Sequence, residues 1–379
     1  MIKLLISTTV PETLITILKG QPEYLSKYFE VELVTSSVVS IDNADYLVKG
    51  ARLSSVDMTR GISPVSDIVS IFNMVRVLMR ARPSIIHSYT PKAGLVCMVA
   101  GWLCRVPIRI HTFTGLIFPT ESGFKQKLLL FADRLICIFA TNVVPEGQGV
   151  RQDLKSFNVT TKPLQVIGYG NIAGVDTTHF SREDKVLLES GAVFKNGLGL
   201  KDRDFVFCYV GRLNRDKGLT ELAAAFRTMP TNCHLVIVGA LDETAPASSD
   251  TLDYFKGSDR VHLIGALSDV RGALMVSDVL VLPSYREGFP NVLLEAGSMG
   301  LPCIATDING SNEIIKPGLN GWLVPAKDIS SLASAMADAL DSSGSELHEM
   351  GLRARERVEA RFEKSAHWDR MVEYYKSLL

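Results

Sequence analysis

The feature that most constrains the fold is an alternation of short apolar runs with segments of helical periodicity, which restarts halfway along the chain. Strands separated by helices indicate right-handed crossovers and hence a parallel, doubly wound α/β sheet. One hydrophobic core seldom holds 379 residues, so two such units in tandem are expected. The expected strands are Lys3–Ser7, Val31–Thr35, Ser84–Ser88, Arg109–Phe113, Asn142–Val144 and Leu164–Ile167, then Asp204–Val210, His234–Val238, Val261–Leu263, Val279–Leu282 and Cys303–Thr306.

We expect the first domain to occupy residues 1–176 and the second residues 177–363, joined by the polar stretch Asp176–Gly199. In doubly wound sheets ligands bind beyond the carboxyl ends of the strands. Two units in tandem would also offer a cleft between them. Functional residues are therefore sought directly after the predicted strands.

Composition excludes several classes of protein. A net charge of −1 gives no global field for nucleic acid, although residues 1–178 carry +5 and the remainder −6. That asymmetry suits an anionic partner or an anionic membrane surface, or it is chance. The six cysteines lie in or beside apolar runs without a C-x-x-C, which fits a reducing cytoplasm and excludes a disulfide framework or a zinc site. Since neither a signal sequence nor a membrane-spanning stretch is evident, we expect a cytoplasmic protein.

A first polar signal follows the strand Asp204–Val210. Gly211 allows a tight turn at the strand end, and Arg212 and Lys217 then stand at the strand tip and at the start of the next helix. Two cations beside free helix N–H groups suit a diphosphate. The alternative interpretation is a solvated basic turn.

A second signal, Glu287 to Glu295, follows the strand Val279–Leu282. Pro290 fits the first turn of a helix, and the backbone N–H groups of Gly288 and Phe289 can face an anion. Glu287 and Glu295 can accept hydrogen bonds from sugar hydroxyls. The alternative is an acid that favours the helix dipole together with a solvated Glu295, but Glu295 lies on an otherwise apolar helix.

In combination these residues resemble the retaining GT-B glycosyltransferases of glycosyltransferase family 4, of the bacterial surface-polysaccharide type. The similarity in the second half covers nearly the whole unit and includes the E-x7-E spacing. Segments of the first half are similar to the family as well. The matching segments are Gly211–Gly218, Glu287–Glu295, Gly300–Asp307 and Asn320–Pro325, with His87–Gly94, His111–Gly115 and Asn171–Asp176 in the first half.

The resemblance implies two Rossmann-like domains with a cleft between them, residues 1–176 on the acceptor side and 177–363 binding the donor. A last helix, about 364–379, packs back on the first domain. Arg212 and Lys217 would hold the donor diphosphate, Glu287 the transferred sugar and Glu295 the ribose. His111 would lie near the anomeric centre, so the catalytic candidates are His111 and Glu287, and no metal or other cofactor is expected. The donor-binding candidates are Gly211, Arg212, Lys217, Glu287, Gly288, Phe289, Pro290, Asn291, Val292 and Glu295.

The activity implied is transfer of a hexose or N-acetylhexosamine from a nucleotide sugar, with UDP as the expected nucleotide. The acceptor would be a glycan or a polyprenyl-diphosphate-linked glycan for lipopolysaccharide or capsule, reached at the inner face of the cytoplasmic membrane through peripheral contact. Two alternatives remain. One is a GT-B sugar-nucleotide epimerase, and the other is a non-catalytic nucleotide-sugar-binding component of a polysaccharide assembly complex.

Other signals point less clearly. Many family members carry Gly-Gly after the first strand, where this chain has Thr8–Glu12, which opens the question of a different acceptor geometry. Gly168–Ala173 matches a dinucleotide fingerprint but ends a unit when it should open one. Asp202–Asp204 matches a metal-binding D-x-D but precedes a strand. Lys125–Phe131 is either a membrane-interface helix or a core helix, and His87 is either structural or a cleft residue.

Overall fold

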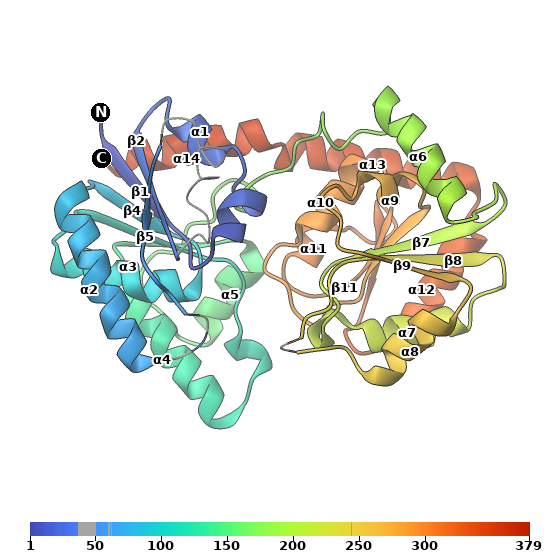
Figure 1. Ribbon diagram of the computed structural model, residues 1–379, viewed down its shortest axis with the longest axis horizontal. Coiled ribbons are helices and arrows are strands. Elements are labelled where there is room, and N and C mark those ends of the chain that lie inside the picture. Colours follow the sequence, from blue (N-terminus) through green and yellow to red (C-terminus); the bar gives the residue numbers. More distant parts are fainter. Residues whose placement is uncertain (37–50, 60, 62, 244) are drawn as a thin grey trace. The chain divides into compact units, whose positions relative to one another are not determined.

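The computed structural model describes residues 1–36, 51–59, 61, 63–243 and 245–379. It divides the chain into two compact units, residues 1–174 with 365–379, and residues 175–364. Each unit has its own six-stranded parallel sheet with helices on both faces (Figure 1). The prediction of two doubly wound α/β domains is therefore confirmed.

The first unit has the strand order β3-β2-β1-β4-β5-β6. Its strands are β1 (Lys3–Ser7), β2 (Glu30–Thr35), β3 (Arg52–Ser55), β4 (Ile85–Ser88), β5 (Ile108–Phe113) and β6 (Asn142–Pro145). Its helices are η1 (Thr13–Ile17), α1 (Gln21–Leu25), α2 (Pro64–Ala81), α3 (Pro91–Leu103), η3 (Phe118–Thr120), α4 (Gly123–Phe139), α5 (Gln148–Ser156) and α14 (Lys364–Ser377).

The strands of this sheet are apolar on both faces, because helices cover each side. Successive side chains alternate between the faces. Leu5 and Ile86 pack with the residues of α2, α3 and α4, whereas Leu4 and Ile6 pack with those of α1 and α14. The unit therefore has two hydrophobic cores divided by one sheet.

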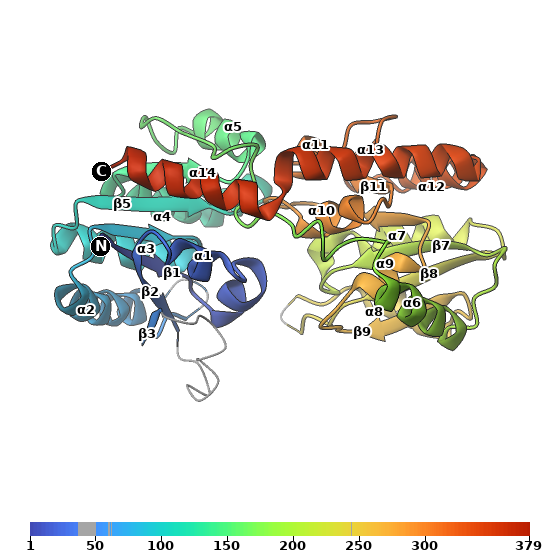
Figure 2. The ribbon, with the colours of Figure 1, turned by 90° about the horizontal axis from the view of Figure 1, so that it is seen from above.

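The C-terminal helix α14 is anchored in the first unit by polar contacts of aromatic residues. The Trp368 indole donates to the Ala173 carbonyl oxygen at 2.9 Å, and the Tyr375 hydroxyl lies 2.6 Å from Nδ1 of His87. Trp368 also contacts Tyr24 of α1, with ring centroids 5.3 Å apart. Figure 2 shows α14 as the red helix at the C-terminal end of the chain.

The second unit has the order β12-β11-β10-β7-β8-β9, which is the same topology. Its strands are β7 (Phe205–Val210), β8 (Cys233–Val238), β9 (Val261–Gly265), β10 (Val279–Leu282), β11 (Cys303–Thr306) and β12 (Gly321–Val324). Its helices are α6 (Lys185–Gly197), η4 (Arg215–Lys217), α7 (Leu219–Arg227), α8 (Ser249–Gly257), α9 (Arg271–Met275), α10 (Asn291–Ser298), α11 (Ser311–Ile314), α12 (Ile329–Asp341) and α13 (Gly344–Phe362).

Both sheets have a topological switch point, where the chain turns from one half of the sheet to the other. It lies between β1 and β4 in the first unit and between β7 and β10 in the second. Connections leave in opposite directions there, which opens a crevice at the carboxyl ends of the strands. The motifs after β7 and β10 therefore meet at the switch point of the second sheet.

The structure differs from the sequence prediction at the margins of the sheets. The edge strands β3 and β12 were not predicted, because each has four residues and no clear apolar alternation. The predicted strand Leu164–Ile167 is wrong, since only Leu164 forms an isolated bridge, to Val143. The polar connection Asp176–Gly199 contains helix α6, whose N-cap Asp184 accepts from two backbone N–H groups.

Candidate functional site

The turn after β7 is built on glycines that allow close backbone contacts. A Cβ at Gly211 would lie 2.9 Å from the Tyr209 hydroxyl, and that hydroxyl donates to the Arg212 carbonyl oxygen at 2.9 Å. Gly218 has φ +65°, and a Cβ there would lie 2.0 Å from the Pro283 carbonyl oxygen. The two loops that carry the predicted donor residues are thus packed directly against each other.

Lys217 and Glu287 meet across these two loops. The Lys217 Nζ donates to Glu287 Oε1 at 2.6 Å, although the residues lie seventy positions apart. The side chains are 19% and 13% exposed, so the pair is largely withdrawn from solvent. The structure therefore brings together the two residues to which the motifs assigned phosphate and sugar.

Two arginines of this edge are also paired with carboxylates. Arg212 Nη1 lies 2.8 Å from Asp242 Oδ2, and Arg286 Nη2 lies 2.8 Å from Asp216 Oδ2. The Arg212 guanidinium remains largely exposed. An anion at this edge can therefore reach Arg212 directly but has to compete with Glu287 for Lys217.

Helix α10 begins at the same edge. Pro290 is its N-cap and Asn291 its first residue, with Val292 in the first turn, and no side chain of the described chain caps it. The preceding loop is held by Gly310, where a Cβ would lie 2.4 Å from the Gly288 carbonyl oxygen and 2.8 Å from the Phe289 Cα. The α10 N-terminus is thus a fixed, uncapped end with the partial positive charge of a helix start.

Glu295 lies one turn further along α10. It is partly buried, and its carboxylate makes no hydrogen bond or ion pair with the described residues. Burial, together with the nearby charge of Asp269, raises the pKa of this carboxyl to about 7. A group of this kind is available to a ligand and titrates near neutral pH.

In the first unit, His111 lies in β5 and is 1% exposed. Its Nδ1 is 2.9 Å from the Ser88 Oγ, whereas its Nε2 is buried and has no hydrogen-bond partner among the described residues. Burial lowers the pKa of this imidazole to about 3, so the ring is neutral.

The other candidate histidine, His87, faces the opposite side of the same sheet. Its Nδ1 lies 2.6 Å from the Tyr375 hydroxyl and its Nε2 lies 2.7 Å from the Thr112 hydroxyl. Its ring also stacks on Tyr89 with centroids 4.2 Å apart. Both nitrogens are therefore occupied, and His87 serves to hold α14 on the sheet.

The segment that replaces Gly-Gly after β1 uses its hydroxyls locally. Thr9 Oγ1 accepts from the Ala93 backbone N–H at 3.2 Å, and the Thr9 N–H donates to Thr90 Oγ1 at 2.8 Å. Thr8 Oγ1 donates to the Val10 carbonyl oxygen at 3.0 Å. Threonine side chains therefore fill the space beside the first turn of α3.

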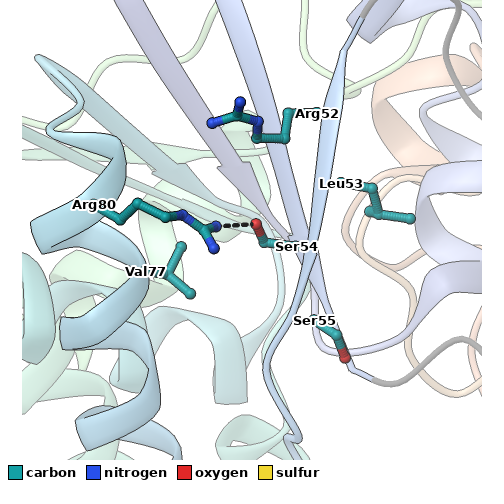
Figure 3. Close-up of a pocket in the computed structure, with 6 residues that line it drawn as sticks. All are labelled: Arg52, Leu53, Ser54, Ser55, Val77 and Arg80. Carbon is teal, nitrogen blue, oxygen red and sulfur yellow. Dashed lines mark hydrogen bonds between the residues drawn. The ribbon is translucent and has the colours of Figure 1, made fainter.

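The remaining sequence signals lie elsewhere. Asp204 precedes β7. Gly168–Ala173 lies in the loop between α5 and α6. No group of metal-ligating side chains occurs among the described residues. A hollow of about 580 Å³ beside β3 and α2 is lined by none of the candidates (Figure 3). It is bordered by Arg52, Leu53, Ser54, Ser55, Val77 and Arg80.

Two polar residues of these edges were missed by sequence reasoning. Asp242 holds Arg212 and also accepts from Asn214 Nδ2 at 3.3 Å. The search for polar residues after strands could have found it, since it follows β8. Ser88, the partner of His111, required the register of β4 on β5, which pairs these two residues.

Comparison with known proteins identifies the family of both units. The family model described as glycosyl transferases group 1 matches residues 192–357, and the glycosyl transferase 4-like domain matches residues 25–170. The capsular polysaccharide biosynthesis glycosyltransferase CapM of Staphylococcus aureus is 29% identical over 371 residues, 96% of this chain and 94% of CapM.

A second relative has a more specific name. The UDP-Gal:alpha-D-GlcNAc-diphosphoundecaprenol alpha-1,3-galactosyltransferase of Escherichia coli is 29% identical over 331 residues, 83% of this chain and 81% of that protein. Among solved structures, sucrose-phosphate synthase from Thermosynechococcus elongatus superposes with a TM-score of 0.81. It covers 99% of each chain at 21% identity, which shows a shared GT-B fold.

Proposed function

Since the chain belongs to the family 4 type of GT-B glycosyltransferases, we propose that it transfers a hexose or N-acetylhexosamine from a UDP-sugar with retention of anomeric configuration. The acceptor is a glycan carried on a polyprenyl diphosphate, and the product is part of a surface polysaccharide. The observation that carries the proposal is the contact of Lys217 with Glu287 at 2.6 Å. Through this contact the motif after β7 meets the motif after β10 at the switch point of the second sheet.

The chemistry of the leaving group follows from the fixed charges of this edge. Departure of a nucleoside diphosphate develops negative charge on the phosphate oxygens. In the proposed reaction Arg212, Lys217 and the uncapped N-terminus of α10 stabilise that charge. Because the diphosphate attracts Lys217, Glu287 is released from the ion pair and becomes free to accept hydrogen bonds from the transferred sugar. No metal is required in this proposal.

The names of the relatives support the substrate classes. CapM is named for capsular polysaccharide biosynthesis, and the Escherichia coli relative for a UDP-linked sugar and a diphosphoundecaprenol-linked acceptor. Both relatives are 29% identical to this chain over most of their length, which supports the same class of reaction for this protein.

We further propose peripheral contact with the membrane that carries such an acceptor. No helix in the described part of the chain combines the length and apolar character that crossing a bilayer requires. Instead α2 and α4 expose apolar side chains at helical spacing, beside the basic residues Arg76, Lys125 and Lys127. Such surfaces bind the interface of anionic bilayers. The exposed apolar residues are Val65, Ile68, Val69, Phe72 and Met79 on α2, and Phe124, Phe131 and Ile138 on α4.

The donor site is tested by thermal shift with UDP, GDP, ADP, NAD and common UDP-sugars, without added metal. Stabilisation by UDP and one UDP-sugar is expected, and Lys217→Ala should abolish it. The same UDP-sugar is then incubated with and without a polyprenyl-diphosphate-linked acceptor. Acceptor-dependent release of UDP supports transfer. Acceptor-independent isomerisation of the sugar would indicate an epimerase, and tight binding without product would indicate a non-catalytic component.

Membrane contact is tested by sedimentation with anionic liposomes. Binding at low salt and release at high salt are expected, because the attraction is partly electrostatic. Phe72→Glu with Phe131→Glu should weaken binding. Val193→Glu on α6 is the matched control, since Val193 is 73% exposed but lies in the second unit. Equal weakening by the control would contradict the proposed surface.

A further inference from the structure

The neutral His111 ring carries one proton, and its surroundings decide which nitrogen holds it. Ser88 and His111 are paired in the register of β4 and β5, so their side chains lie side by side on the face covered by α3. The Ser88 Oγ is 2.9 Å from the His111 Nδ1 and 3.4 Å from the Ile110 carbonyl oxygen. Ser88 is itself fully buried, so water does not compete for this hydroxyl.

The proton of Ser88 has a carbonyl oxygen to which it can be donated. A carbonyl can only accept, so when the Ser88 proton is donated to the Ile110 oxygen it is not donated to His111. The Ser88 oxygen is then an acceptor for an N–H at His111 Nδ1. If Nδ1 carries the proton of a neutral imidazole, Nε2 carries a lone pair.

The ring is also held in place from the other side. A Cβ at Gly94, in the first half of α3, would lie 2.4 Å from the His111 Cε1 and 2.7 Å from its Nδ1. Phe113 meets the ring edge-on at a centroid distance of 4.5 Å. The ring therefore has little freedom to turn over and exchange the positions of its two nitrogens.

We propose that Ser88 is a positioning residue that fixes His111 as the Nδ1–H tautomer, so that Nε2 is an acceptor for a substrate hydroxyl. This assignment rests on the proposed transfer reaction and on the place near the anomeric centre that the family resemblance gives His111. It explains why the Nε2 of a buried histidine lacks a partner among the described residues, since a buried polar atom without one calls for an explanation. A hydroxyl of the sugar or acceptor supplies the missing hydrogen bond.

The tautomer can be read directly from the wild-type protein. Protein labelled with ¹⁵N in its seven histidines is measured by long-range ¹H–¹⁵N correlation, and His111→Asn assigns the resonances. An unprotonated Nε2 and a protonated Nδ1 at pH 7.5 are expected. A protonated Nε2 overturns the proposal, whether or not the protein transfers sugar. Failure of the transferase assay instead tells against the proposed function and leaves the spectrum unchanged.

Substitution of Ser88 tests the positioning role. Ser88→Ala should produce a population of the Nε2–H tautomer and lower kcat/KM about tenfold, the size of one lost hydrogen bond. Ser88→Thr, which keeps the hydroxyl, should restore the Nδ1–H tautomer. The matched control is Thr112→Val, which removes the hydroxyl partner of His87 on the other face of the sheet. An unchanged His111 tautomer in Ser88→Ala, or an equal shift in Thr112→Val, would overturn the proposal.

Discussion

The carboxyl edges of the two sheets share a topology but differ in chemistry. In the second unit the edge is charged, and three of its cations, Arg212, Lys217 and Arg286, are each paired with a carboxylate. In the first unit the side chains beside the switch point are neutral hydroxyls and the imidazole of His111, and the ion pair of Lys92 with Asp67 lies at the start of α3. Under the proposed function, one fold would therefore provide two kinds of binding edge, one for an anion and one for uncharged hydroxyl groups.

The two edges also satisfy their polar groups differently. An ion pair in a partly buried loop can exchange one anion for another, because its carboxylate and an incoming phosphate compete for the same cation. A neutral hydrogen-bonded network has no such competitor and is pre-organised. The charged edge is therefore expected to respond to nucleotide, and the neutral edge to stay fixed.

The largest effect is expected for Lys217→Ala. Removal of the cation deprives the leaving diphosphate of its least exposed positive charge, so kcat/KM should fall about 10²- to 10³-fold. Initial rates of UDP release from the donor identified by thermal shift measure this. The matched control is Lys195→Ala, which breaks a 2.8 Å ion pair with Asp202 elsewhere in the second unit. A loss below tenfold in Lys217→Ala would remove the charged edge from the reaction.

The two histidines of the first unit should separate stability from activity. His87→Ala leaves the Tyr375 and Thr112 hydroxyls without their partner and opens a cavity, so unfolding should become easier by about 3 kcal/mol. His111→Ala opens a cavity of similar size but leaves only Ser88 without its partner, so it should cost about 1 kcal/mol less than His87→Ala but lower kcat/KM roughly 10²-fold. Urea titrations and rates on the same samples give both quantities. Equal losses of activity in the two variants, at equal stability, would contradict the different roles given to His87 and His111.

The sequence predicted the interior of each sheet better than its margins. Lys3–Ser7, Val279–Leu282 and Cys303–Thr306 were predicted with the bounds that the structure has, because each is an apolar run that ends at breaking residues. Edge strands such as β3 (Arg52–Ser55) bury few side chains and therefore do not form an apolar run in the sequence. Helix α6 was hidden in a polar stretch, since only one of its faces packs on the second unit.

The site was predictable in its residue types but not in its pairings. Spacing and resemblance identified Lys217 and Glu287, but a sequence gives no distance between them. The acid that holds Arg212, Asp242, belongs to a loop whose path depends on tertiary packing. Ser88 acquires its role from strand register alone. Roles that depend on a cross-strand partner are therefore absent from the sequence until the register is known.

Buried neutral histidines should also make the stability of the first unit sensitive to acid. Burial lowers the pKa of His87 far below its usual value, that of His111 to about 3 and that of His367 to about 4. Unfolded histidine titrates near pH 6.5, so the stability from these neutral rings is complete above that pH and is lost as the pH falls. Asp133 opposes this, because burial raises its pKa to about 7 and the acid form is stabilised on acidification.

In the first unit three histidines outweigh one carboxyl, so acidification from pH 7.5 to 5 should lower the free energy of unfolding of this unit by about 3 kcal/mol. Urea denaturation followed by circular dichroism at the two pH values measures the change. His367→Gln should reduce the pH dependence by about 2 kcal/mol, the contribution of one buried ring. A pH dependence that is unchanged in this variant would show that other groups cause it.

The smallest effect is expected for Glu295, a candidate residue of the charged edge that has no ion-pair partner among the described residues. The pKa of Glu295 is raised to about 7, so this carboxyl is largely protonated at pH 6 and ionised at pH 8. An ionised carboxylate accepts stronger hydrogen bonds from ribose hydroxyls, which lowers its pKa in the complex. Donor affinity should therefore rise about tenfold from pH 6 to pH 8. Glu295→Gln, which cannot titrate, should bind with an affinity that is flat over this range, as calorimetry with UDP can measure. An equal slope in both proteins would place the titrating group elsewhere and leave Glu295 as a buried acid of the α10 core.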